Sequence, residues 1–156
     1  MIRVVLDANV LVSAALARDP AAPSVRVFDA LLDGRIEAVG CPALLGEVAA
    51  VLGRDRIRRY LSINEARRFV TDLAGVMTLA ADPPTPYAAV CRDSDDDYLV
   101  ALARAALVDA LVTGDRDLLE VDDIGVAVIT PRELVERLAR CPVELRASGR
   151  RRRSSS

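Results

Sequence analysis

The sequence predicts an α/β fold in three layers, with helices on both faces of a parallel central sheet of four to five strands. Three observations predict it. Short apolar runs rich in β-branched residues alternate with longer segments of helical periodicity, and prolines and glycines separate the two kinds of segment. The chain has 156 residues, of which 52% are hydrophobic, and this is enough for one domain with a sizeable core.

The expected strands are short runs that a parallel sheet would bury. The clearest is IRVVL at residues 2–6, which is apolar, rich in β-branched side chains and followed directly by Asp7. Helical segments between most of the runs favour parallel pairing. The expected strands are residues 2–6, 36–39, 76–80, 109–113 and 126–129.

The expected helices follow from their boundary residues. Pro42 opens one helix and Gly53 closes it. Ser24 is the expected cap of a second helix, and Asn64 of a third. The expected helices are residues 10–17, 24–32, 43–53, 65–76, 94–107 and 131–140.

The remaining segments are connections and a tail. Residues 54–60 form a charged connection, residues 82–86 (DPPTP) a loop and residues 114–123 a turn. Residues 1–140 then make up one domain. Residues 141–156, rich in Arg and Ser, are expected to be a disordered tail.

The composition excludes several kinds of catalysis. The chain has no His, which excludes Ser–His–Asp triads and His-ligated metals, and no Lys, which excludes Schiff bases. Three widely spaced cysteines, Cys41, Cys91 and Cys141, indicate reduced thiols in a cytoplasmic protein. We expect no signal peptide and no membrane span. The chemistry must therefore use carboxylates, hydroxyls and arginine.

The charge is unevenly distributed. The formal net charge is −2, from 21 arginines and 23 acidic residues. Residues 146–156 hold five of the arginines and no acid, so the rest of the chain has 16 arginines against 23 acids, a net charge of −7. An acidic body argues against nucleic-acid binding by charge alone. It is compatible with a nucleic-acid enzyme whose acids hold cations at a phosphate.

Acidic side chains follow the expected strands at the edge where parallel sheets place their sites. Asp7 follows strand 2–6, and Asp115 and Asp117 follow strand 109–113. The run Asp95 to Asp97 opens a helix that starts at the same edge. Each acid alone could be a helix cap or belong to a solvated first turn, since Asp is favoured there. Because the positions converge, we expect a shared site.

Glu47 is the acid that could complete this site. It lies beside Leu44 and Val51 at the edge of the apolar stripe of its helix, and without a nearby cation it would be an ordinary surface glutamate. Several carboxylates in one cleft must either protonate or bind a cation. An all-oxygen site suits Mg²⁺ or Mn²⁺, held partly through water, and such ions promote phosphodiester hydrolysis.

Four motifs occur in a fixed order: LDANVLVSA, LLGEV, DSDDDYLVALA and LVTGDRDLL. Together they resemble the PIN-domain ribonucleases, in particular the bacterial VapC-like toxins of type II toxin–antitoxin pairs. The resemblance covers residues 2 to about 140. The catalytic acids that it implies are Asp7, Glu47, Asp97 and Asp115. The metal ligands that it implies are Asp7, Asp96, Asp97, Asp115 and Asp117, with Asn9 and Thr113 as supporting polar residues.

The resemblance also implies an activity and partners. It implies a three-layer α/β/α fold and a Mg²⁺- or Mn²⁺-dependent endoribonuclease, and we expect single-stranded RNA as its substrate. It further implies a homodimer, and a small antitoxin that covers the acidic site. The run of three aspartates leaves open whether Asp96 or Asp97 is the main third acid.

Other functions remain as alternatives. A catalytically silent module of the same fold, binding RNA or a partner, would be expected to have lost acids, and here each expected position is filled. A receiver domain is disfavoured because the chain lacks the lysine of such pockets. DNA stays open as a substrate, since carboxylates do not read the 2′-hydroxyl.

The composition also indicates which kind of residue would bind the substrate. The chain has few aromatic residues, which argues against base-stacking platforms, so arginines would hold the substrate. A charge cluster lies in the connection after helix 43–53, and a solvated helix face would show the same pattern. The candidate RNA contacts are Arg54, Arg56, Arg58 and Arg59.

Overall fold

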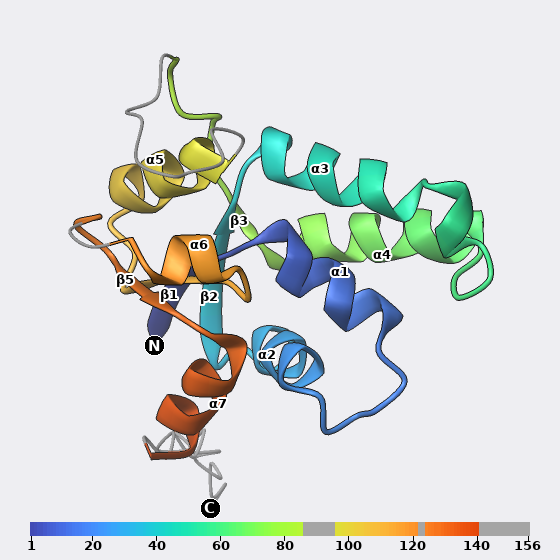
Figure 1. Ribbon diagram of the computed structural model, residues 1–156, viewed down its shortest axis with the longest axis horizontal. Coiled ribbons are helices and arrows are strands. Elements are labelled where there is room, and N and C mark those ends of the chain that lie inside the picture. Colours follow the sequence, from blue (N-terminus) through green and yellow to red (C-terminus); the bar gives the residue numbers. More distant parts are fainter. Residues whose placement is uncertain (86–95, 122–123, 141–156) are drawn as a thin grey trace, which may run out of the picture.

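The computed structural model describes residues 1–85, 96–121 and 124–140. Five parallel strands form one sheet flanked by helices, which confirms the three-layer α/β/α fold expected from the sequence (Figure 1). The strand order is β3-β2-β1-β4-β5. The strands are β1 (Ile2–Leu6), β2 (Ile36–Gly40), β3 (Thr78–Leu79), β4 (Ala110–Val112) and β5 (Ala127–Ile129).

The helices of these described ranges connect the strands. No helix among them is both long and apolar enough to span a membrane. A short 3₁₀ helix, Asp55–Ile57, follows α3. The α-helices are α1 (Ala8–Leu16), α2 (Pro23–Leu32), α3 (Pro42–Leu52), α4 (Ile63–Val76), α5 (Asp97–Ala105), α6 (Arg116–Leu119) and α7 (Pro131–Arg140).

Strand β1 is the centre of the core. Val4, Val5 and Leu6 are completely buried, as the apolar run in the sequence predicts for a strand covered on both faces. The strand pairs with β2 on one side and β4 on the other, and α5 packs against both β1 and β4. The first strand of the chain is thus held in place partly by β4 and α5, which lie far from it in the sequence.

The carboxyl ends of β1, β4 and β5 lie level with one another. Leu6 pairs with Val112, which in turn pairs with Ile129. Just beyond them, the backbone N–H of Asp7 donates to the carbonyl of Val112 at 2.9 Å, and that of Thr113 donates to the carbonyl of Ile129 at 3.0 Å. This register brings the side chains that follow β1 and β4 together.

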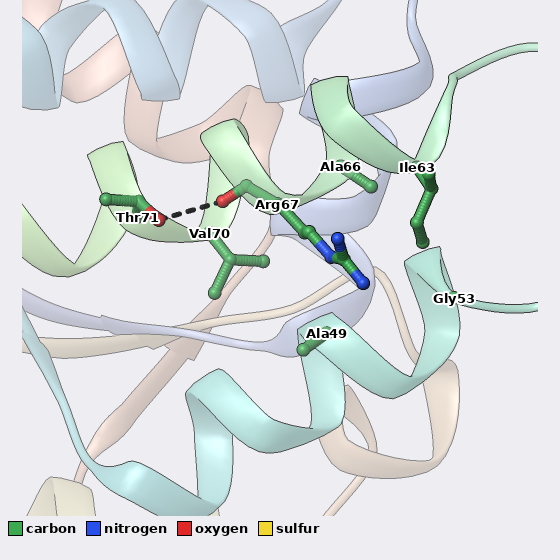
Figure 2. A pocket seen from close by; sticks show the side chains of 7 residues that line it. All are labelled: Ala49, Gly53, Ile63, Ala66, Arg67, Val70 and Thr71. Carbon is green, nitrogen blue, oxygen red and sulfur yellow. Dashed lines mark hydrogen bonds between the residues drawn. The ribbon is translucent and has the colours of Figure 1, made fainter.

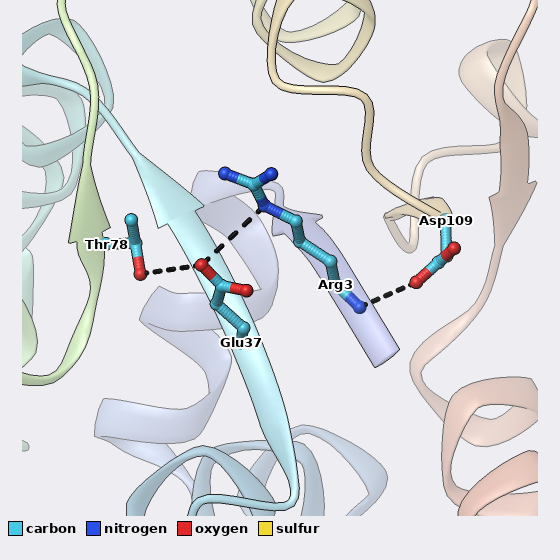
Figure 3. Close-up of polar contacts among 4 residues, drawn as sticks. All are labelled: Arg3, Glu37, Thr78 and Asp109. Atoms are coloured by element: carbon cyan, nitrogen blue, oxygen red, sulfur yellow. Dashed lines mark hydrogen bonds and ion pairs between the residues drawn. The ribbon is translucent and has the colours of Figure 1, made fainter. Parts of the chain in front are cut away.

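Polar contacts near the amino ends of the strands support the same register (Figure 3). The backbone N–H of Arg3 donates to Oδ2 of Asp109 at 2.8 Å, and Nε of Arg3 lies 3.6 Å from Oε1 of Glu37. The hydroxyl of Thr78 donates to the same Glu37 oxygen at 3.0 Å. These contacts connect β1, β2 and β3 with the residue that precedes β4.

Three helices begin at residues other than those expected. Helix α1 starts at Ala8 because Asp7 caps it, and α2 starts at Pro23 rather than at the expected cap Ser24. Helix α4 starts at Ile63, and its cap is not Asn64. Ser62 accepts from the backbone N–H of Glu65 at 3.1 Å, and the Glu65 side chain accepts from the N–H of Ser62 at 3.2 Å.

Other segments differ in length. Residues 114–123, expected to be a turn, contain the one-turn helix α6, which Asp115 caps. Strand β3 has only two residues and is exposed. Helix α5 begins at Asp97, and the part of the expected helix at residues 94–95 lies outside the described residues. The expected tail, residues 141–156, also lies outside them.

Candidate active site at the carboxyl edge of the sheet

Asp7 is both a helix cap and a buried carboxylate. Its Oδ1 accepts the backbone N–H of Asn9 at 3.3 Å, and its Oδ2 accepts the hydroxyl of Thr113 at 2.7 Å. The residue is only 4% exposed. Burial raises the pKa of Asp7 above its ordinary value, the two hydrogen bonds oppose the rise, and the nearby carboxylates of Glu47 and Asp115 add to it. Asp7 is therefore held in a defined orientation at a cost in electrostatic energy.

Thr113 connects Asp7 to the segment after β4. The residue is fully buried, and its hydroxyl accepts the backbone N–H of Asp115 at 3.0 Å while donating to Asp7. The carboxylate of Asp115 in turn accepts the N–H of Asp117 at 2.9 Å and caps α6. One threonine thus orients two of the expected acids, because β1 and β4 end side by side.

Four carboxylates line one cavity of about 350 Å³. They come from four separate places in the fold: the end of β1, the middle of α3, the start of α5 and the cap of α6. Asn9, Ser13 and Val51 are also among the lining residues. The four acids are Asp7, Glu47, Asp96 and Asp115.

The two candidates for the third acid occupy different environments. Asp96 lies at the N-terminal cap of α5 and lines the cavity. Asp97, in the first turn of the same helix, is 5% exposed and is not among the described residues that line the cavity. Adjacent residues on a helix point in different directions, since each residue turns the helix by about 100°. Asp117 is exposed in the first turn of α6 and does not line the cavity either.

Tyr98 is a residue of this site that sequence reasoning missed. It follows Asp97 in α5, is 8% exposed and donates a hydrogen bond from its phenol to Oε2 of Glu47 on α3. Burial, followed by the hydrogen bond to Glu47, raises the pKa of the Tyr98 phenol, so the phenol is protonated and acts as a donor. Nothing in the local sequence shows that these two side chains meet, because they lie 51 positions apart.

The donor set fits a hard divalent cation. Every charged side chain among the described residues that line the cavity is a carboxylate, and oxygen ligands are those that Mg²⁺ and Mn²⁺ prefer. Asp7 is buried among other negative charges, a situation that a cation would relieve. In the described part of the chain, no three acidic or cysteine side chains stand ready-made around one ion. Such a site would complete its shell with water, as is usual for Mg²⁺.

The expected arginine cluster lies away from this cavity. Helices α3 and α4 run side by side away from the sheet, and the connection with Arg54, Arg56 and Arg59 is at their far end (Figure 1). The terminal nitrogens of Arg58 are buried and have no hydrogen-bond partner among the described residues. No arginine of this cluster is among the described residues of the acid cavity.

A second hollow adjoins the acid cavity. It measures about 440 Å³ and shares Asn9 and Ser13 with that cavity. Its other lining residues include Ser24 at the start of α2, Gly114 after β4, and Arg132 in the first turn of α7. The described lining contains no carboxylate residue, so a hollow that has one arginine and several hydroxyls lies beside an acidic one.

A third hollow, of about 470 Å³, lies between α3 and α4 (Figure 2). Small residues create it, since Ala49, Gly53 and Ala66 leave space where larger side chains would fill the groove. Val70 lines it as well, and the side chain of Arg67 extends from α4 toward α3 in Figure 2. None of the expected acids belongs to its described lining.

Comparison with known proteins agrees with this geometry. The family model described as PIN domain matches residues 3–117, which is more than half of the chain. No curated protein matches it. Among solved structures, PAE2754 from Pyrobaculum aerophilum has a TM-score of 0.61 at 19% identity, over 90% of this chain and 91% of that one.

Two further structures share the fold. VapBC2 from Rickettsia felis, bound to a DNA fragment from its promoter, has a TM-score of 0.57 at 11% identity and covers 83% of this chain and 98% of that one. FitAcB from Neisseria gonorrhoeae has a TM-score of 0.54 at 20% identity, with the same coverage of 83% and 98%. With the family model, the parallel sheet and the acids at its carboxyl edge in agreement, the chain belongs to the PIN domain family.

Proposed function

We propose that this protein is a Mg²⁺- or Mn²⁺-dependent endoribonuclease that cuts single-stranded RNA in the cytoplasm, and that it is the toxin of a toxin–antitoxin pair. The observation that carries the proposal is the cavity lined by Asp7, Glu47, Asp96 and Asp115. Membership of the PIN family supports hydrolytic nuclease chemistry, since PIN domains are generally nucleases.

Each acid contributes from a position that the fold restrains. Asp7 is held through both carboxylate oxygens, and Asp115 through its contact with the N–H of Asp117. Glu47 approaches from α3 and Asp96 from the start of α5. These four carboxylates would hold the metal. When bound, Mg²⁺ or Mn²⁺ supplies the positive charge that polarises a phosphodiester and lowers the pKa of a water molecule.

The adjoining hollow supports a path for the RNA strand. A strand whose scissile phosphate lies in the acid cavity must place a neighbouring phosphate nearby, and Arg132 and Ser24 offer a guanidinium and a hydroxyl there. We therefore assign substrate affinity to this hollow in place of the cluster around Arg56. Ser13 and Asn9, shared by both hollows, would lie between the two phosphates.

The partner part of the proposal is an antitoxin. The motifs of this chain resemble the toxin branch of the family, and VapBC2, which shares the fold, is bound to a DNA fragment from its promoter. We propose that a small protein encoded beside this one covers the acid cavity, and that the nuclease is a homodimer. Co-expression with the product of the adjacent reading frame should give a stable complex that cannot cut RNA.

The test of the nuclease itself is direct. Purified protein should cut end-labelled single-stranded RNA when Mg²⁺ or Mn²⁺ is present and stop when EDTA is added. Asp7→Asn should lower the rate by about two orders of magnitude or more, the scale of losing transition-state charge stabilisation. Glu37→Gln, prepared in parallel, alters a carboxylate outside the described lining of the cavity and should cut at the wild-type rate.

Three outcomes are informative. Cleavage that Asp7→Asn leaves undiminished would contradict the proposed site. Faster cleavage of a matched single-stranded DNA would change the substrate class but keep the site. RNA that is bound and never cut would identify the catalytically silent module instead.

A further inference from the structure

The hydrogen bond between Tyr98 and Glu47 connects two helices that otherwise have little contact. Tyr98 is the second residue of α5, and Glu47 lies in the middle of α3. In the described structure α3 packs mainly on α1 and α4, whereas α5 packs on β1 and β4. The phenol–carboxylate contact therefore fixes how these two parts of the fold are placed at the cavity.

Glu47 is the acid that most needs an external restraint. Asp7 and Asp115 have short side chains and cap the helices that follow them, so their orientations are set locally. Glu47 has a longer, half-buried side chain with three rotatable bonds, and it projects from the edge of the buried face of its helix. A carboxylate that can move between solvent and cavity is a poor ligand, since ordering it costs free energy when the ligand binds.

The phenol provides that restraint while leaving acceptor positions of the carboxylate available. It is buried and attached to a rigid aromatic ring, and it donates to Oε2 alone. A carboxylate has two oxygens and about four acceptor positions, so one oxygen can accept the phenol while the group still offers capacity to a cation. Ligating carboxylates in metal sites are commonly hydrogen-bonded in this way.

We propose that Tyr98 is a positioning residue of the nuclease site, which holds the carboxylate of Glu47 in the orientation that the metal requires. The inference rests on the proposed function, because it assigns Glu47 to metal binding. It adds a residue that touches neither the RNA nor the ion and acts through one acid alone. Tyr98→Phe should thus reproduce part of the effect of Glu47→Gln.

Binding of Mn²⁺ alone, without RNA, tests this separately from activity. Free Mn²⁺ can be followed by its electron paramagnetic resonance signal during titration of the whole chain. Tyr98→Phe should weaken Mn²⁺ binding by about tenfold to a hundredfold, the usual cost of losing a partner of a metal ligand. The matched control Tyr60→Phe removes the phenol of a residue beyond α3 that is 56% exposed, and it should bind Mn²⁺ like the wild type.

A double-mutant cycle shows whether Tyr98 acts through Glu47. In the Glu47→Gln background, adding Tyr98→Phe should change Mn²⁺ binding little further, because the group that the phenol positions is already lost. Equal and additive losses would mean that Tyr98 acts by another route and would overturn the inference. In cleavage assays, Tyr98→Phe should lower kcat and leave KM for RNA near its wild-type value.

A second measurement covers the case in which Tyr98→Phe does not fold. The chain has no Trp, so tyrosines are its main sensitisers for the emission of bound Tb³⁺, which also prefers oxygen ligands. Tb³⁺ bound beside Glu47 in the wild type should be excited through tyrosine. Tb³⁺ that binds without sensitised emission would contradict the placement of the Tyr98 phenol directly behind Glu47.

The failures of the two proposals can be told apart. If the wild type binds no Mn²⁺, or if Asp7→Asn and Glu47→Gln bind it as tightly as the wild type does, the proposed metal site is wrong and this inference falls with it. If Glu47→Gln weakens Mn²⁺ binding and a folded Tyr98→Phe does not, the metal site stands and only the role of Tyr98 is overturned.

Discussion

The hydroxyl of Thr113 donates a 2.7 Å hydrogen bond to Oδ2 of Asp7, across the junction between the carboxyl ends of β4 and β1. Both residues are buried, so the bond lies in a region of low dielectric where an unsatisfied carboxylate oxygen is costly. The same hydroxyl accepts the N–H of Asp115. Stability and site geometry therefore depend on one side chain.

Replacing Thr113 by Val should destabilise the protein by about 1–3 kcal/mol, the cost of leaving a buried polar group without its partner. Thr113→Ser keeps the hydroxyl and should lose less. Urea denaturation of the metal-free proteins at neutral pH measures both changes. A valine variant as stable as the wild type would show that the bond to Asp7 contributes nothing to stability.

The raised pKa of Asp7 predicts how metal-free stability depends on pH. Because the folded-state pKa lies above the ordinary value of 3.8, the folded state binds more protons than the unfolded state between the two values. The unfavourable contribution of Asp7 is therefore largest at neutral pH and disappears as the pH falls toward 3.8. Denaturation curves give the free energy of unfolding of the wild type and of Asp7→Asn. The difference between these two free energies should change as the pH falls across this window. A constant gap would contradict the shift.

Adding metal should stabilise the wild type by mass action. At a Mn²⁺ concentration about 100 times the dissociation constant, the gain is roughly 2.7 kcal/mol. Asp7→Asn should gain much less, because it lacks one of the ligands. Thermal melts with and without Mn²⁺ test this, and equal shifts in both proteins would mean that the ion binds elsewhere.

Arg132 and Arg56 form a matched pair for the RNA path. Arg132→Ala should raise KM for single-stranded RNA about tenfold, the scale of one charge-assisted hydrogen bond, and leave kcat unchanged. RNA binding by Arg132→Ala should also depend less steeply on salt. The plot of the logarithm of the binding constant against the logarithm of the salt concentration should have a slope that is smaller by about 0.7 for a single strand. Arg56→Ala should match the wild type in both quantities. The reverse result would restore the cluster after α3 as the RNA contact.

Much of the fold could be predicted because it depends on patterns within short segments. The apolar run of β1 and the alternation of strands with helices are such patterns. The sequence also contains the signal for the true cap of α4, since Ser62 and Glu65 stand at the spacing of a capping box, which the expected cap Asn64 lacks. The helix α6 was missed because it is a single turn whose sequence is rich in residues that also favour turns.

The site was most predictable where it depends on strand ends, although Glu47, in the middle of α3, also lines the cavity. Asp7 and Asp115 follow buried strands, and parallel pairing places them together. The choice between Asp96 and Asp97 depends on the residue at which α5 begins, and such boundaries are the weakest part of any prediction from sequence. The partnership of Tyr98 with Glu47 depends on how α3 and α5 are placed in space, which no local pattern records.

The long sequence separation between β1 and β4 determines when the site is completed during synthesis. Synthesis delivers Asp7 and Glu47 early, but the threonine that holds Asp7 comes 106 positions after it and Asp115 later still. Until β4 has left the ribosome, β1 can pair with β2 but not with β4, and the set of acids is incomplete. Under the proposed function, a chain assembled in this order stays inactive while it is still beside the ribosome and the messenger RNA that encodes it.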